Sequence, residues 1–146
     1  MELKTYDISE DRKRKSFRFT STGIKGDVSK LVLYQETSIP NLFNLAFGDY
    51  NPITGELDDL IVTDNGDGEK VLATVVSTIY HFYKEHPNAI VYLTGSTPSR
   101  TRLYRIAISK YLPVFEEKFE ILGELSEGWE RFQNNIKYEG FFIKQK

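Results

Sequence analysis

The chain has 146 residues, of which 40% are hydrophobic, 14% aromatic and 27% charged, and 19 basic against 21 acidic residues give a net charge of −2. This length predicts a single domain over residues 1–146, and the charge balance excludes a general attraction to nucleic acid or anionic membranes. The absence of cysteine excludes disulfides, thiolate catalysis and cysteine–zinc sites, and two histidines are too few for a histidine-rich metal site. We predict no metal site and no cofactor.

The first third of the chain predicts strands. Phe17 and Phe19 alternate with polar residues, which is the period-two pattern of a half-buried strand. A turn at Lys25-Gly26-Asp27 separates them from an apolar run at 31–34, and a third alternating segment follows at 43–47. These three segments predict an antiparallel meander.

An acidic, turn-rich stretch and then a helix are expected next. Residues 49–69 contain seven acidic residues and no Lys or Arg, and a short strand is expected at 60–62. From Glu69 onward the apolar residues recur at helical spacing, with Thr74 and Thr78 on the opposite, polar face. Pro87 should end this helix at or before the preceding residue.

The second half of the chain predicts a buried strand followed by a second helix. Residues 89–93 are continuously apolar, which is typical of a central strand buried on both faces. Thr97 as N-cap and Pro98 at the first helical position predict a helix that runs to about Leu112, before Pro113.

Two late strands complete the predicted fold. They are expected at 119–122 and 141–143, with a short helical turn around Trp129 and Phe132 between them. The order of elements predicts an α+β fold, with a mixed, mostly antiparallel sheet of about five to seven strands and two main helices.

Four segments carry a resemblance to a known family. They are NLAFGD at 44–49, TDNGD at 63–67, KVLATV at 70–75 and GSTPSRTRLYR at 95–105. Together they resemble an uncharacterised family of small single-domain bacterial proteins, a domain of unknown function, over nearly the whole chain. The resemblance implies a bacterial, single-domain protein and supplies no activity, substrate or catalytic residue.

The start of the second helix is the strongest candidate for a binding site. Its first two turns carry arginines and no acidic residue, although a helix N-terminus favours anions. Hydroxyls, backbone N–H groups and guanidinium forks at this position suit a phosphate group. The alternative is that the arginines pair with the acidic stretch 49–69. The candidate ligand-binding residues are Ser96, Thr97, Ser99, Arg100, Arg102 and Arg105.

The acidic stretch is a weaker candidate. Asp58, Asp59, Asp64 and Asp67 offer the oxygen ligands that Mg²⁺ and Ca²⁺ use. Their spacing does not match a calcium-binding loop, and Asp or Asn beside Gly is first of all a turn former. A metal site is therefore not predicted here.

Three functions remain open from the sequence. The leading hypothesis is a small binding module that recognises a phosphate-bearing partner, a nucleotide or RNA, at Ser96 to Arg105. The first alternative is a protein-interaction or regulatory partner, such as a toxin–antitoxin component. The second is an enzyme using coenzyme A, because Asp64 to Gly68 entering a helix, and the pair Leu103-Tyr104, resemble the acetyltransferase superfamily. Two aspartates facing a pyrophosphate would repel it.

The sequence limits the location of the chain only through the features that it lacks. The segment after Met1 lacks the apolar core of a signal peptide, and no apolar run is long enough to span a membrane. We therefore expect a cytoplasmic protein with no membrane contact. The sequence predicts neither the oligomeric state nor a catalytic residue.

Overall fold

A computed structural model describes residues 4–58, 64–95 and 98–146, without the side chains of Ser99 and Arg100. Contacts divide the chain into two compact units. The first unit consists of residues 1–34 and 46–84, and the second of residues 35–45 and 85–146. The chain passes from one unit to the other within strands β3 (Gly26–Glu36) and β4 (Leu42–Asn51) and at the last residue of helix α1 (Gly68–Glu85).

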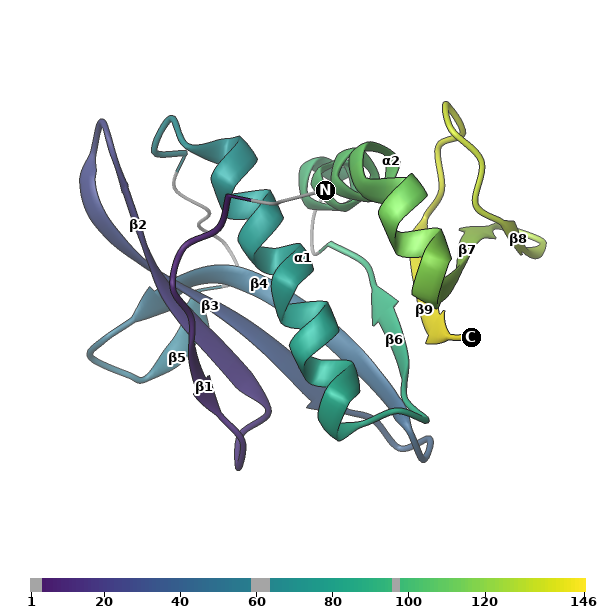
Figure 1. The fold of residues 1–146 in the computed structure, drawn as a ribbon, viewed down its shortest axis with the longest axis horizontal. Coiled ribbons are helices and arrows are strands. Elements are labelled where there is room, and N and C mark those ends of the chain that lie inside the picture. Colours follow the sequence, from purple (N-terminus) through teal and green to yellow (C-terminus); the bar gives the residue numbers. More distant parts are fainter. Residues whose placement is uncertain (1–3, 59–63, 96–97) are drawn as a thin grey trace. The chain divides into compact units, whose positions relative to one another are not determined.

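The described residues form two helices and nine strands (Figure 1). The sheet is mixed and mostly antiparallel, so the predicted α+β fold is confirmed, with more strands than expected. Neither helix is long and apolar enough to cross a membrane. The remaining elements are β1 (Ser9–Asp11), β2 (Ser16–Gly23), β5 (Glu56–Asp58), β6 (Ile90–Leu93), α2 (Pro98–Lys118), β7 (Phe119–Leu125), β8 (Gly128–Arg131) and β9 (Gly140–Gln145).

In the first unit the strands neighbour one another in the order β1-β2-β3-β4, with β5 paired to β4. The predicted alternation in β2 is confirmed, since Phe17 and Phe19 are buried and Arg18 is exposed. The β2–β3 hairpin closes with a two-residue turn between Gly23 and Gly26. Strands β1 and β5 were not predicted, because each has only three residues and no alternating apolar pattern.

Helix α1 packs its apolar residues against the buried face of these strands. The ring of Phe82 stacks on that of Tyr34 with centroids 4.0 Å apart. On the same face Phe19 and Phe47 stack at 6.4 Å. The helix ends at Glu85, as the sequence predicted from Pro87. The core of the first unit therefore lies between α1 and one face of β2 to β4.

The prediction of an exposed polar face on α1 is wrong at two positions. Thr74 and Thr78 are fully buried rather than exposed. Each hydroxyl donates to a carbonyl of its own helix, Thr74 to Lys70 at 2.7 Å and Thr78 to Val75 at 2.7 Å. Thr78 also hydrogen-bonds the Tyr34 hydroxyl at 2.9 Å. Because these bonds satisfy the hydroxyls, burial of the polar residues carries little penalty.

In the second unit the strand order is β4-β6-β9-β7-β8. Strand β6 is parallel to β4 and antiparallel to β9, so it is central as predicted. It is buried on one face only: Val91 and Leu93 are inaccessible, whereas Ile90 is 37% exposed and Tyr92 is half-buried. The Tyr92 ring packs on Phe142 at 4.6 Å, which lets an aromatic residue occupy the more open face.

Two further expectations for the second unit are wrong. Helix α2 continues through Pro113 to Lys118, because its last turns bury Phe115 against Phe119 with ring centroids 6.0 Å apart. Trp129 lies in strand β8, which pairs with β7 through a two-residue turn, and not in a helical turn. In both places burial or strand pairing outweighs the local preference.

The proline inside α2 generates a stability prediction. Replacing Pro113 by Ala restores an N–H that can donate to the Ser109 carbonyl, and Pro113 is exposed, so little packing is lost. We expect the free energy of unfolding to rise by about 1–3 kcal/mol, after allowance for the greater freedom of the unfolded chain. Urea unfolding measures it, with Pro87→Ala, outside any helix, as the control. An unchanged or lowered stability of Pro113→Ala contradicts this account.

Candidate functional site

The predicted anion site lies where strand β6 leads into helix α2. Ser96 and Thr97 lie outside the described residues, and the described helix begins at Pro98. The segment before it is held at two points: the Thr94 hydroxyl donates to the Glu139 carbonyl at 3.1 Å, and the Gly95 N–H donates to the Thr101 hydroxyl at 3.0 Å. Thr94 and Gly95 are thus tied to the segment before β9 and to the first turns of α2.

The structure describes the side chains of two of the three predicted arginines. Arg102 is exposed and Arg105 half-buried, and their spacing of three residues places them on one face of α2, one turn apart. Neither side chain makes an ion pair with a described residue of its own unit. Ser99 and Arg100 belong to the first turn, which contains no acidic residue. Pairing of the arginines with the stretch 49–69 stays a prediction.

Two carboxylates of the acidic stretch already have partners within the first unit. Asp49 forms an ion pair with Lys30, whose Nζ lies 2.6 Å from its Oδ1, and Lys30 is 1% exposed. Asp64 accepts from the N–H of Gly66 at 3.0 Å, which closes a turn. Within the described part of the chain no group of three or more potential ligands could hold a metal ion. Asp59 and the expected strand 60–62 lie outside the described residues.

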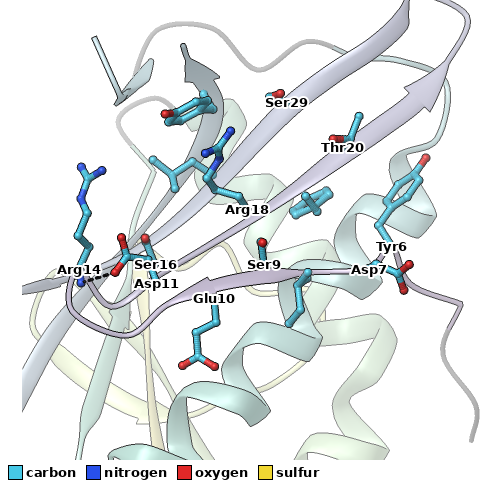
Figure 2. Close-up of a pocket in the computed structure, with 14 residues that line it drawn as sticks. Tyr6, Asp7, Ser9, Glu10, Asp11, Arg14, Ser16, Arg18, Thr20 and Ser29 are labelled. Atoms are coloured by element: carbon cyan, nitrogen blue, oxygen red, sulfur yellow. Dashed lines mark hydrogen bonds between the residues drawn. The ribbon is translucent and has the colours of Figure 1, made fainter. Parts of the chain in front are cut away.

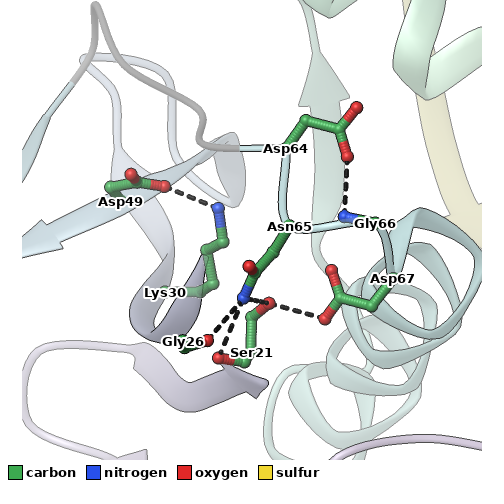
Figure 3. A network of polar contacts seen from close by, with 8 residues as sticks. All are labelled: Ser21, Gly26, Lys30, Asp49, Asp64, Asn65, Gly66 and Asp67. Atoms are coloured by element: carbon green, nitrogen blue, oxygen red, sulfur yellow. Dashed lines mark hydrogen bonds and ion pairs between the residues drawn. The ribbon is translucent and has the colours of Figure 1, made fainter. Parts of the chain in front are cut away.

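Asn65 joins this stretch to the β2–β3 hairpin (Figure 3). Its amide Nδ2 donates to the carbonyl of Gly26 at 2.8 Å and to the Ser21 hydroxyl at 3.2 Å, and its Oδ1 accepts from the Lys25 N–H at 2.6 Å. Its carbonyl accepts from the Ile24 N–H at 3.1 Å. A Cβ at Gly23 would lie 2.0 Å from this carbonyl oxygen, so only glycine fits there. The side chain is 1% exposed.

Asp67 precedes α1 and ties the N-terminal segment to the same network. Its carboxylate accepts from the hydroxyls of Ser21 and Tyr6, each at 2.5 Å. Burial disfavours the charged form, but these two hydrogen bonds and the positive charge of Lys30 outweigh burial and hold the pKa of Asp67 below its ordinary value of 3.8. The Tyr6 N–H also donates to the Thr74 hydroxyl at 2.9 Å. Asp67 is therefore a structural carboxylate in this network.

The first unit also contains an open groove that the sequence did not predict (Figure 2). Its volume is about 700 Å³, and its lining includes residues of β1, β2, β3 and β4. At its centre the guanidinium of Arg18 stacks on the ring of Tyr50, with Cζ 3.8 Å from the ring centroid. The signal in the sequence is the alternation of Arg18 and Thr20 with Phe17 and Phe19 along β2.

An aromatic row lies on the more open face of the second unit. Trp129 is 59% exposed and packs edge-on against Phe142 at 4.4 Å. Beside it the Tyr92 hydroxyl donates to Glu124 at 2.6 Å. Burial and this hydrogen bond raise the pKa of Tyr92 to about 12, so the hydroxyl stays protonated at neutral pH.

The chain belongs to a protein family of unknown function, DUF6934, whose model matches residues 2–146. This confirms the resemblance to an uncharacterised family over nearly the whole chain; a bacterial origin stays a prediction. No match was found among curated proteins or among solved structures. The family assignment therefore brings no activity, ligand or partner with it.

The Asn65 network predicts a large loss of stability on truncation. In Asn65→Ala the Lys25 N–H and the Gly26 carbonyl lose their side-chain partner at a buried position. We expect the free energy of unfolding to fall by about 2–3 kcal/mol. Urea denaturation measures the change, and Asn134→Ala, at an exposed turn, serves as the matched control. A loss no larger than that of the control would show that the network contributes little.

The lowered pKa of Asp67 predicts a pH-dependent contribution. A carboxyl whose folded pKa is below its unfolded value stabilises the fold above the unfolded pKa, and this stabilisation is lost as the pH falls through the folded pKa. Between about pH 6 and about pH 3, wild type should therefore lose more stability than Asp67→Asn in urea unfolding. Asp27→Asn, an exposed change in the same hairpin, should behave as wild type. Equal losses in all three proteins would refute the role of Asp67.

Proposed function

We propose that this protein is a small binding module that recognises a phosphate-bearing partner, a nucleotide or RNA, at the start of α2. The observation that carries the proposal is the arrangement of Arg102 and Arg105 on one face of the first two turns of a helix with no acid in its first turn. Positive charges at the positive end of a helix dipole oppose folding unless an anion neutralises them.

The described residues beside the proposed site are positioned by hydrogen bonds. Thr94 and Gly95, at the end of β6, are bonded to the Glu139 carbonyl and the Thr101 hydroxyl, so these two residues need no ligand to place them. The carboxyl end of β6, a central strand with a parallel neighbour, leads into the same turn. Ligands of α/β proteins commonly bind at such strand ends. Ser96, Thr97, Ser99 and Arg100 remain candidate contributors on sequence grounds.

A protein partner is the second candidate function, and the exposed Trp129 beside Phe142 favours it. Exposed aromatic residues are common at protein interfaces. The coenzyme A alternative gains no such observation. In the loop before α1 the Asn65 amide is bonded to the hairpin and the Asp67 carboxylate to Ser21 and Tyr6, so these groups are not free for a pyrophosphate.

A thermal-shift screen tests the proposal. Wild type and Arg102→Ala/Arg105→Ala are compared with phosphate, nucleotides, coenzyme A and a short RNA. A ligand at 100 times its dissociation constant adds about 2.7 kcal/mol of stability, which raises Tm by several degrees. We expect such a rise in wild type and its loss in the double variant. The matched control, Lys137→Ala/Lys146→Ala, removes two exposed charges elsewhere in the second unit and should keep the rise.

Two outcomes contradict the proposal. If no anion raises Tm of wild type, the arginines do not form a phosphate site, and the protein-partner alternative becomes the leading one. If an anion stabilises all three proteins equally, binding occurs away from Arg102 and Arg105.

A further inference from the structure

The groove of the first unit lies on the face of the sheet opposite α1. Directly paired residues of neighbouring strands project to the same face, so the register places Ser9, Arg18 and Leu31 side by side across β1, β2 and β3. Thr20 and Ser29 form the next pair along these strands. With a volume of about 700 Å³ the groove falls within the range of small-molecule sites.

Arg18 projects from β2 into the centre of this groove and lies over the Tyr50 ring. Its planar cation stacks on Tyr50 at 3.8 Å, and stacking uses the face of the guanidinium while leaving its N–H edge open. Within the described residues of the first unit this guanidinium makes no ion pair and no hydrogen bond. A guanidinium fork with no acceptor among the described residues of the unit suits a carboxylate or a phosphate.

The neighbouring polar groups suit hydroxyls of the same ligand. The side chains of Ser9, Thr20 and Ser29 line the groove, and their hydroxyls make no hydrogen bond with a described residue of the unit. Asp11, at the other end, offers carboxylate oxygens, one of which accepts the Arg14 N–H at 3.2 Å. Carboxylates accept hydrogen bonds from hydroxyls but repel anions, so the acidic end selects a ligand with only one anionic group.

Glu10 does not reverse this charge pattern. It alternates with Ser9 and Asp11 along β1, and Figure 2 shows it pointing away from Arg18. Glu10 is among the residues that line the groove, but its carboxylate lies 3.9 Å from the Nε of Arg12, a residue outside the lining. The other charged residues of the lining are Arg18 at the centre, Asp7 and Asp11 along the N-terminal segment and β1, and Arg14, which lies beside Asp11 and whose side chain donates to the Gly55 carbonyl.

We infer that this groove is a binding site for a small polyhydroxylated oxyanion, a sugar phosphate or a sugar acid, whose anionic group bonds to Arg18. The hydroxyls of the ligand bond to Asp11 and to the Ser9, Thr20 and Ser29 side chains. This site belongs wholly to the first unit and does not depend on the arginines of α2.

Amide NMR titration of the full chain tests the inference. The probes are ribose 5-phosphate for the phosphate source, gluconate for the carboxylate source, and uncharged ribose as the ligand control. We expect saturable shifts of groove amides with one of the two anions in the millimolar range or below. Arg18→Ala should weaken this binding by about tenfold or more, the value of one charge-assisted fork. Arg18→Lys, which keeps the charge without the fork, should also weaken it.

The matched control is Arg12→Ala, which removes an exposed arginine outside the groove and should bind as wild type. Phosphate binding alone identifies a sugar phosphate, and carboxylate binding alone a sugar acid. The inference is overturned if neither anion gives saturable shifts. It is equally overturned if Arg18→Ala binds as wild type, or if Arg12→Ala weakens binding as much as Arg18→Ala does. Arg102→Ala/Arg105→Ala leaves this groove intact. The thermal-shift test of the α2 site and the NMR test of the groove can therefore fail separately.

Discussion

The first unit depends on how one loop satisfies buried polar groups. Asn65 is inaccessible, yet its side chain and carbonyl bond to groups of four residues of the β2–β3 hairpin, including the Gly26 carbonyl and the Lys25 N–H. Asp67, two residues later, binds Ser21 of the same hairpin and Tyr6 of the N-terminal segment. The desolvation penalty of leaving one of these groups without a partner exceeds the net stabilisation from one hydrogen bond. The hairpin, the loop and the start of α1 therefore depend on one another for stability.

The same hydrogen-bond network also positions a residue at the edge of the groove. Tyr6 lies at its margin, bonded through its hydroxyl to Asp67 and through its N–H to Thr74 of α1, and its ring stacks on Phe19 at 5.8 Å. These contacts position Tyr6, from which the chain continues into β1. Buried polar bonds on one face of the sheet thus support an open, hydroxyl-rich surface on the other.

The two candidate sites differ in how far the sequence alone could find them. The start of α2 was predicted because Pro98 and the run of arginines are local in the chain, and the helix does begin there. The groove was missed because Ser9, Arg18 and Tyr50 come together only through strand pairing and the stacking of Arg18 on Tyr50. The register of β1 on β2 could not be predicted, since β1 has three exposed residues and no apolar pattern.

By itself the sequence determined the α+β class, the alternating strands of the first third, and the starts of both helices, because periodicity and capping act between near neighbours in the chain. Only the tertiary structure decided that Thr74 and Thr78 are buried, that α2 continues through Pro113, and that Trp129 lies in a strand. For Thr78 and Trp129 the deciding contact is with an element far along the chain, Tyr34 and β7 respectively. Such contacts outweigh propensity differences of a few tenths of a kcal/mol. At the end of α2 the deciding contact is between near neighbours, Phe115 and Phe119, and the helix continues although proline inside a helix costs about 3 kcal/mol.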